Sequence, residues 1–175
     1  QKIFTVTIRY NRYILKIEKQ TELYEPYIYG NEKKYLNECI SRNELTFGKF
    51  SREFPKKISK LTKCKYPLQV QNGTSALYLC LRAVNIKKND EIIVPSITFI
   101  ASINVVNYCN AHPIFMDVDD TCNIDLDKTI EFLKKKTIFK NGYTFNKKTK
   151  RRISAIIVVH TFGNVVNLNR NYLNF

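Results

Sequence analysis

The sequence contains few of the residues that build metal centres and disulfide frameworks. Its 175 residues include two histidines, five cysteines and no tryptophan. The cysteines, at positions 39, 64, 80, 109 and 122, are odd in number and widely spaced, without a Cys-x-x-Cys pair or a Cys/His cluster. This pattern argues against a zinc finger and a disulfide scaffold, so we expect no metal site. It also favours a reducing, cytoplasmic setting.

Long apolar runs are absent as well. No stretch of the sequence has the length and apolar content that a bilayer-spanning helix requires. The apolar residues near the N-terminus are interrupted by Arg9, Arg12 and Lys16, which is not the pattern of a secretory signal. The sequence therefore predicts no membrane partner.

Acidic residues are scarce, with 15 Asp and Glu against 29 Lys and Arg and a formal net charge of +14. Such a charge raises nucleic-acid binding as a hypothesis. However, the lysines are scattered, and no helix-turn-helix, zinc-finger or RNA-recognition pattern accompanies them. The basic concentration at residues 147–152 is more typical of a solvated surface. We therefore do not expect nucleic acid as a partner, although a non-catalytic basic binding protein stays open as an alternative.

The composition that remains is that of a globular protein, with 44% hydrophobic and 25% charged residues. Its most informative stretch is residues 72–118. A helical period begins after Gly73, carried by Leu77, Cys80, Leu81 and Val84. Asn89 and Asp90 then form a turn, and the apolar run 91–94 indicates a strand that ends at Pro95. Loop, helix, turn and strand in this order predict a parallel α/β layer.

The start of this helix contains the tripeptide Gly73, Thr74 and Ser75. The first N–H groups of a helix have no internal partner and lie at the positive end of its dipole, so they can bind a phosphate. The simpler alternative is that Thr74 or Ser75 only caps the helix. A strand candidate at residues 66–71 would deliver the chain to this loop, as in open α/β sheets.

The other expected elements follow from period and turn chemistry. Asn31 should cap a helix with an apolar face at residues 35–40, and a second helix at 50–61 should be split or kinked by Pro55. The later pattern predicts helices at 100–108 and 127–136, and strands at 114–118 and 153–160, the last buried on both faces. Asn141 and Gly142 predict a hairpin over 137–145. The acids at 117, 119 and 120 lack calcium-loop spacing, which favours turn chemistry.

Four blocks in this order, NGTSAL, DEIIVPSITFIAS, IFMDV and VVHTFG, resemble the pyridoxal-phosphate-dependent sugar aminotransferases of the DegT/DnrJ/StrS type. The resemblance covers about residues 23–166. It implies the α/β fold of the N-terminal part of a type I pyridoxal-phosphate transferase large domain, with a mostly parallel sheet flanked by helices. Residues 1–22 stay an unassigned extension, and residues 23–175 form the partial domain. The hairpin resembles an insertion in the legionaminic-acid-type branch of the family.

The resemblance also implies roles for five residues. Gly73, Thr74 and Ser75 would hold the phosphate of pyridoxal 5'-phosphate, and Phe99 would stack on its pyridine ring. Without the resemblance, Phe99 would be interpreted as a core residue. His160, at the end of a predicted strand, would contact cofactor or substrate, and a purely structural histidine is an equal alternative.

The implied activity is transfer of an amino group, with glutamate as donor, to a nucleotide-linked keto sugar in polysaccharide or glycan precursor biosynthesis, by a homodimer. Such enzymes need a lysine that forms a Schiff base with the cofactor. In the family this lysine lies beyond the HxFG block, and no lysine of this chain stands in its context. We therefore expect no catalytic residue here, and a truncated chain that is inactive alone. A related sugar dehydratase, in which histidine replaces that lysine, is the second alternative.

Overall fold

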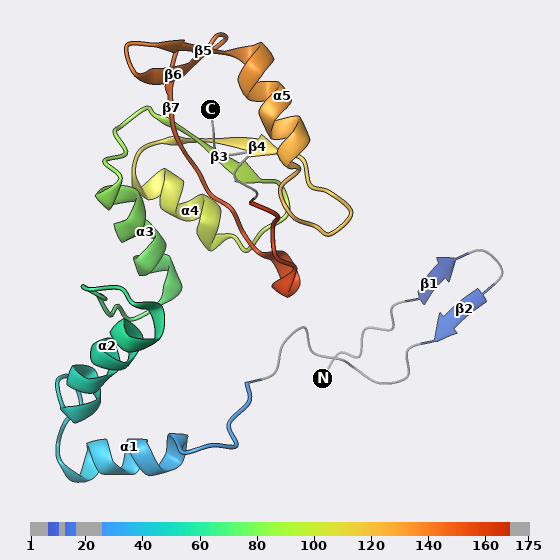
Figure 1. Cartoon of the computed structure of the whole chain (residues 1–175). Coiled ribbons are helices and arrows are strands. Elements are labelled where there is room, and N and C mark those ends of the chain that lie inside the picture. The colour runs from blue at the N-terminus through green and yellow to red at the C-terminus, as the bar shows by residue number, and fades with distance from the viewer. Residues whose placement is uncertain (1–6, 11–12, 17–25, 169–175) are drawn as a thin grey trace. The chain divides into compact units, whose positions relative to one another are not determined.

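The structure, a computed structural model, describes residues 7–10, 13–16 and 26–168. The chain divides into two compact units, Gln1–Pro67 and Leu68–Phe175 (Figure 1). The predicted boundary between residues 22 and 23 lies outside the described residues. Within the described part, no helix is both long enough and apolar enough to cross a membrane.

The first unit contains a strand pair and two helices. Strands β1 (Thr7–Tyr10) and β2 (Tyr13–Lys16) pair antiparallel, in a region where the sequence predicted no element. Helices α1 (Glu32–Ser41) and α2 (Lys49–Thr62) lie where their apolar spacing predicted them.

Two details of these helices differ from expectation. Helix α2 runs through Pro55 as one element, so the predicted split is wrong. Because α2 has no buried residue, water can reach the carbonyl that the proline leaves unpaired. Asn31 precedes α1, but its side chain makes no capping bond. Instead, the Glu32 carboxylate accepts a hydrogen bond from the Gly30 N–H at 2.8 Å.

The second unit is built on a five-stranded sheet with the order β4-β3-β7-β6-β5. Strand β3 lies between β4 and β7 and is parallel to both, while β6 is antiparallel to β7 and to β5. This confirms the predicted α/β fold with a mostly parallel sheet. The bounds of the unit's elements are α3 (Gly73–Ala83), β3 (Glu91–Pro95), α4 (Ala101–Tyr108), β4 (His112–Met116), α5 (Leu126–Lys136), β5 (Thr137–Lys140), β6 (Tyr143–Asn146), β7 (Arg152–Ile156) and the 3-10 turn η1 (Thr161–Gly163).

Strand β3 is the centre of the core, and all five of its residues are buried. Side chains alternate between the two faces of a strand. Ile92 and Val94 accordingly join the cluster made with α3 and α4, which contains Leu81 and Val105. Ile93 instead joins the cluster with Met116 and Ile124, against which the half-buried Phe132 and Leu133 of α5 pack. Helices therefore cover both faces of the parallel strands, which explains the unbroken apolar run in the sequence.

The hairpin prediction is confirmed in its turn as well as in its strands. Asn141 and Gly142 have φ angles of 53° and 79°, the left-handed values that a two-residue type I′ turn requires. Two other expectations are wrong. Residues 66–71 form no strand, since Pro67 lacks an N–H and no neighbour pairs with them. Strand β7, expected at residues 153–160 and buried on both faces, ends at Ile156 and is only half-buried.

Two polar pairs hold the amino end of β3: Asp90 with Arg152 joins it to β7, and the buried pair of Glu91 with Asn146 joins it to the hairpin strand β6. The Asp90 carboxylate accepts hydrogen bonds from Arg152 Nε at 3.0 Å and from Arg152 Nη2, and another from the Lys87 N–H at 2.8 Å. Asn146 Nδ2 donates to Glu91 Oε2 at 2.9 Å. Burial alone would raise the pKa of Asp90, but the bonds from Arg152 and Lys87 outweigh it, so this pKa lies below its usual value.

Candidate functional site

The predicted site residues converge on one edge of the sheet. Strands β3 and β7 are parallel, so their carboxyl ends lie at the same edge. Phe99 follows β3, and His160 follows β7. Helix α3 leads through a short turn into the amino end of β3, which places its own N-terminus back at the carboxyl edge. Figure 1 shows the starts of α3 and α4 and the turn η1 on this same side. Ligands of open α/β sheets bind at this edge.

At the start of α3 the capping residue is Asn72, which the sequence reasoning missed. Its side-chain oxygen accepts a hydrogen bond from the Ser75 N–H at 2.8 Å. The expectation that Thr74 or Ser75 fills this role is therefore wrong. Both hydroxyls make no hydrogen bond within the described residues, and both side chains are half-exposed. A Cβ added at Gly73 would meet nothing within 4 Å, so the space before the helix is open.

Phe99 is 78% exposed, which excludes its interpretation as a core residue. It lies in the turn between β3 and α4, where its carbonyl accepts a hydrogen bond from the Ser102 N–H at 3.0 Å. The same turn is closed by Thr98 Oγ1 donating to Ser102 Oγ at 3.2 Å. The backbone that carries the ring is therefore held in place by two contacts at the start of α4, while the ring itself remains accessible.

His160 is exposed and precedes η1. Its Nδ1 accepts a hydrogen bond from the Val166 N–H at 3.1 Å. A neutral histidine that accepts at Nδ1 carries its proton on Nε2. Nε2 is then a donor on an exposed ring at the carboxyl edge. The structure thus gives His160 a structural bond through one nitrogen and leaves the other available for a ligand.

Phe162 is the unusual residue of this loop. Its φ of 54° and ψ of 22° lie in the left-handed region of the backbone. The residue is also 77% exposed, so burial of its ring does not explain this conformation. Such a backbone is strained for a bulky residue and persists only where neighbouring contacts hold it. The Gly163 N–H donates to the His160 carbonyl at 3.2 Å, and the Asn164 N–H donates to the Thr161 carbonyl at 3.0 Å.

Replacing Phe162 with glycine should cost about 1 kcal/mol less than replacing Phe99, which lies outside the left-handed region and is equally exposed. Glycine relieves the backbone strain at Phe162. At Phe99 there is no such strain to relieve, and glycine only raises the conformational entropy of the unfolded chain. Urea unfolding followed by circular dichroism measures both changes. A larger loss for F162G than for F99G would show that the Phe162 ring contributes packing and that its backbone is not strained.

Asn123 joins this loop to the one after β4, and the sequence reasoning missed it. Its side chain is buried, with Oδ1 accepting from the Thr161 N–H at 3.0 Å and Nδ2 donating to the Asn164 carbonyl at 3.1 Å. Nδ2 also donates to Thr121 Oγ1 at 3.0 Å. The bonds to Thr161 and Asn164 span 38 and 41 positions along the chain, and no local sequence signal predicts them. The cap at Asn72, by contrast, could have been found from its place before the helical period.

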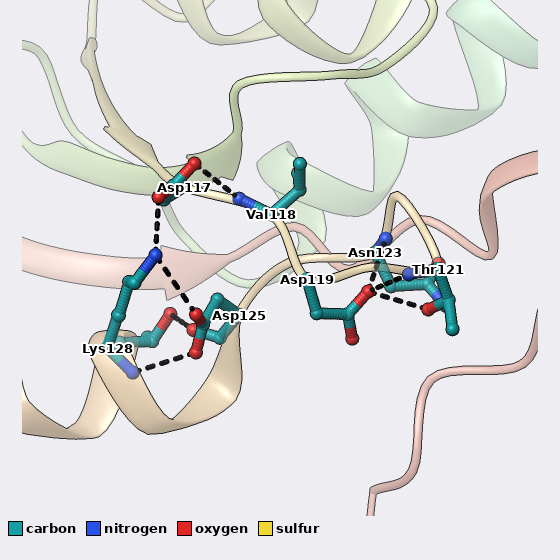
Figure 2. A network of polar contacts seen from close by, with 8 residues as sticks. Asp117, Val118, Asp119, Thr121, Asn123, Asp125 and Lys128 are labelled. Carbon is teal, nitrogen blue, oxygen red and sulfur yellow. Dashed lines mark hydrogen bonds and ion pairs between the residues drawn. The ribbon is translucent and has the colours of Figure 1, made fainter. Parts of the chain in front are cut away.

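The loop after β4 is closed by its acids, as Figure 2 shows. The Asp119 side chain accepts hydrogen bonds from the Thr121 N–H at 2.8 Å and the Asn123 N–H at 3.1 Å, so the predicted turn chemistry is confirmed for Asp119. The bond from the Thr121 hydroxyl is the main reason that the pKa of Asp119 lies below its usual value.

Lys128 lies beside this loop, with its ammonium group bonded to Asp117 and lying 3.4 Å from Asp125 (Figure 2). These carboxylates raise its pKa, chiefly through the bond to Asp117. An amine must lose its proton before it attacks a carbonyl, so this environment makes Lys128 a poor nucleophile.

The fold and the site define an α/β protein with an open helix start and an exposed aromatic ring at the carboxyl edge. Comparison with known proteins assigns the chain to a family. The chain belongs to the DegT/DnrJ/EryC1/StrS aminotransferase family, which it matches over residues 26–171.

Individual relatives agree with this assignment. A GDP-perosamine synthase from Vibrio cholerae is 37% identical over 142 residues, which cover 81% of this chain and 35% of the relative. A dTDP-3-amino-3,6-dideoxy-alpha-D-galactopyranose transaminase from Aneurinibacillus thermoaerophilus is 37% identical over 73% of this chain and 31% of its own length. The crystal structure of a family aminotransferase from Brucella abortus superposes with a TM-score of 0.67 at 25% identity, covering 81% of this chain and 35% of that one. The chain thus spans about a third of the length of these relatives.

Pyridoxal 5'-phosphate is the cofactor of this family, and a sugar aminotransferase from Streptococcus pneumoniae with a similar fold is known in its pyridoxal- and pyridoxamine-phosphate forms. The residues at the carboxyl edge fit this cofactor. A helix start with open space in front of it and two unbonded hydroxyls suits a phosphate dianion. An exposed aromatic face suits a planar ring.

Proposed function

We propose that this chain provides the phosphate-binding and ring-stacking part of a pyridoxal-phosphate-dependent sugar aminotransferase. The observation that supports the proposal most directly is the hydrogen bonding at the start of α3. There the Asn72 cap satisfies the Ser75 N–H and leaves the hydroxyls of Thr74 and Ser75 without partners in the described chain. Within this family fold, that arrangement at the carboxyl edge is best explained by a phosphate ligand.

Each residue has a separate task in this proposal. The backbone at Gly73 and the hydroxyls of Thr74 and Ser75 donate hydrogen bonds to the phosphate, whose charge the helix dipole also stabilises. Phe99 covers one face of the cofactor ring and excludes water from it. His160 donates from Nε2 to an acceptor on the cofactor or the substrate. When bound, the cofactor supplies an electron sink for amino-group transfer.

We propose a nucleoside-diphosphate-linked keto sugar as the substrate and glutamate as the amino donor. The support comes from the relatives, which are named for GDP-, dTDP- and UDP-linked amino sugars. This variety supports the substrate class and leaves the nucleotide and the legionaminic-acid-type branch as finer proposals. Precursor supply for a surface polysaccharide, a cytoplasmic setting and a homodimer belong to the same proposal. A GDP-4-keto-6-deoxy-D-mannose-3-dehydratase from E. coli shares the fold at 22% identity, and this similarity supports the fold alone.

Titration of the purified chain with pyridoxal 5'-phosphate, followed by absorbance, tests the proposal. Removing both hydroxyls in T74A/S75A should weaken binding about 100-fold, because each hydrogen bond to a charged group contributes roughly tenfold or more. The control S59A/T62A removes the same two groups from α2, where they bond to backbone carbonyls, and should leave binding unchanged. Equal affinity of T74A/S75A and the unmodified chain would contradict the phosphate site, and an unmodified chain that binds no cofactor would contradict the proposal as a whole.

A further inference from the structure

One end of the second unit carries a local excess of positive charge. Residues 132–152 contain nine lysines and arginines and no acidic residue. They come from the end of α5, the β5–β6 hairpin and the turn before β7. Lys135 forms an ion pair with Glu131 and Arg152 forms one with Asp90, and both carboxylates lie outside the segment. The segment and these two partners together keep a net charge of nine minus two, which is +7.

The fold holds these charges together. The Lys147 N–H donates to the Lys136 carbonyl at 2.9 Å, and Lys147 Nζ donates to the Lys135 carbonyl at 3.0 Å. These bonds tie the turn after β6 to the end of α5. We call the surface formed by residues 134–151 the basic end. It lies at the amino edge of β7, opposite the carboxyl edge that holds the candidate site, and Figure 1 shows the hairpin beside the end of α5.

Large apolar side chains project from the same hairpin. Ile138 is 52% exposed and Phe139 is 73% exposed, between the lysines at 136 and 140. Tyr143 is also 52% exposed, and the Arg152 guanidinium lies 5.2 Å from the centre of its ring. Apolar residues flanked by lysines are typical of surfaces that enter the boundary between lipid headgroups and acyl chains.

We propose that the basic end docks on an anionic phospholipid bilayer. Its lysines meet the lipid phosphates, while β5, an edge strand of the sheet, enters the interface edge-on, with Ile138 on one of its faces and Phe139 on the other. Peripheral binding of this kind needs no membrane-spanning segment. A nucleic acid fits the surface less well, since Ile138 offers no ring for base stacking and Arg152 already occupies one face of Tyr143, so that Phe139 alone of these three side chains is left as a stacking platform. The observations that carry this inference are independent of the proposed function.

Co-sedimentation of the purified chain with vesicles tests the proposal. Vesicles of phosphatidylcholine with added phosphatidylglycerol should bind the chain, and vesicles of phosphatidylcholine alone should not. The variant K140Q/K148Q/K150Q should weaken binding about 100-fold, at roughly fivefold for each lysine near the surface. The variant I138S/F139S should also weaken it. The control K56Q/K57Q/K60Q removes the same charge from exposed positions of α2 and should change binding less than about threefold.

Three results would overturn the proposal. Equal losses in the two triple variants would show that only the net charge matters. Equal binding to neutral and anionic vesicles would remove the role of lipid phosphate. Tighter binding to a single-stranded RNA oligonucleotide than to anionic vesicles, lost in K140Q/K148Q/K150Q, would assign the basic end to nucleic acid instead. The affinity of the same variants for pyridoxal 5'-phosphate should equal that of the unmodified chain. Failure of the membrane proposal is therefore distinguishable from failure of the aminotransferase proposal.

Discussion

Replacing Asp90 with alanine is expected to destabilise the second unit by about 3 kcal/mol, because it leaves the guanidinium of Arg152 without its carboxylate at a mostly buried position. The side chains of Asp90 and Arg152 are 8% and 23% exposed, and the pair joins residues 62 positions apart. D90A also removes the acceptor of the Lys87 N–H. Since the sequence has no tryptophan, urea unfolding followed by circular dichroism is the suitable measurement.

The exposed pair of Glu131 and Lys135 is the matched control. Its side chains are 59% and 68% exposed, and E131A should change the stability by less than about 0.5 kcal/mol. A double-mutant cycle with R152A then isolates the coupling between Asp90 and Arg152. If D90A and E131A cost the same, the pair of Asp90 and Arg152 does not stabilise the junction between the amino ends of β3 and β7.

The pair of Asp90 and Arg152 also predicts how the stability difference between the unmodified chain and D90A depends on pH. The pKa of Asp90 lies below its usual value in the folded chain, so its contribution is complete above the unfolded pKa of about 3.9. It is lost as the pH falls through the lower, folded pKa. The stability difference between the unmodified chain and D90A should therefore be constant near neutrality and shrink below about pH 4. A difference that shrinks only at alkaline pH would contradict this assignment.

Replacing Asn123 with alanine is expected to cost about 2–3 kcal/mol, because it leaves the buried Thr161 N–H and the Asn164 carbonyl without partners. The loss should act on the loop that carries His160 and Phe162. Hydrogen exchange at the Thr161 amide should accelerate by more than the change in global stability alone would produce.

The variant N107A is the control for this prediction. Asn107 is exposed on α4, and its side chain makes no hydrogen bond within the described residues. N107A should change the stability by less than about 0.5 kcal/mol. An N123A chain whose Thr161 amide exchanges at the rate of the unmodified chain would show that Asn123 does not hold the loop.

The sequence predicted those elements whose signals are local. The apolar spacing from Leu77 to Val84 placed α3, the apolar run before Pro95 placed β3, and Asn141-Gly142 placed the hairpin turn. Each depends on a period or on the conformational preference of one or two residues. The carboxyl-edge position of Phe99 and His160 also followed, since it depends only on the order of strands and loops.

The parts that could not be predicted depend on distant partners. The strand expected at residues 66–71 has the right composition, but a strand forms only where a neighbour pairs with it. The bonds of Asn123 to Thr161 and Asn164 and the pairing of Asp90 with Arg152 are long-range and leave no periodic trace. The strained φ of Phe162 likewise arises from the loop contacts around it and contradicts the residue's own preference.

The length of β3 determines how strongly the basic end can act on an anion at the start of α3. Five residues at about 3.3 Å each separate the amino and carboxyl edges by roughly 16 Å. This is about twice the screening length of physiological salt, which is near 8 Å. The potential of the basic end therefore falls several-fold before it reaches the start of α3, and a phosphate there depends on its immediate donors. At about 0.01 M salt, where screening extends to roughly 30 Å, the two ends would act on an approaching anion as one attractive field.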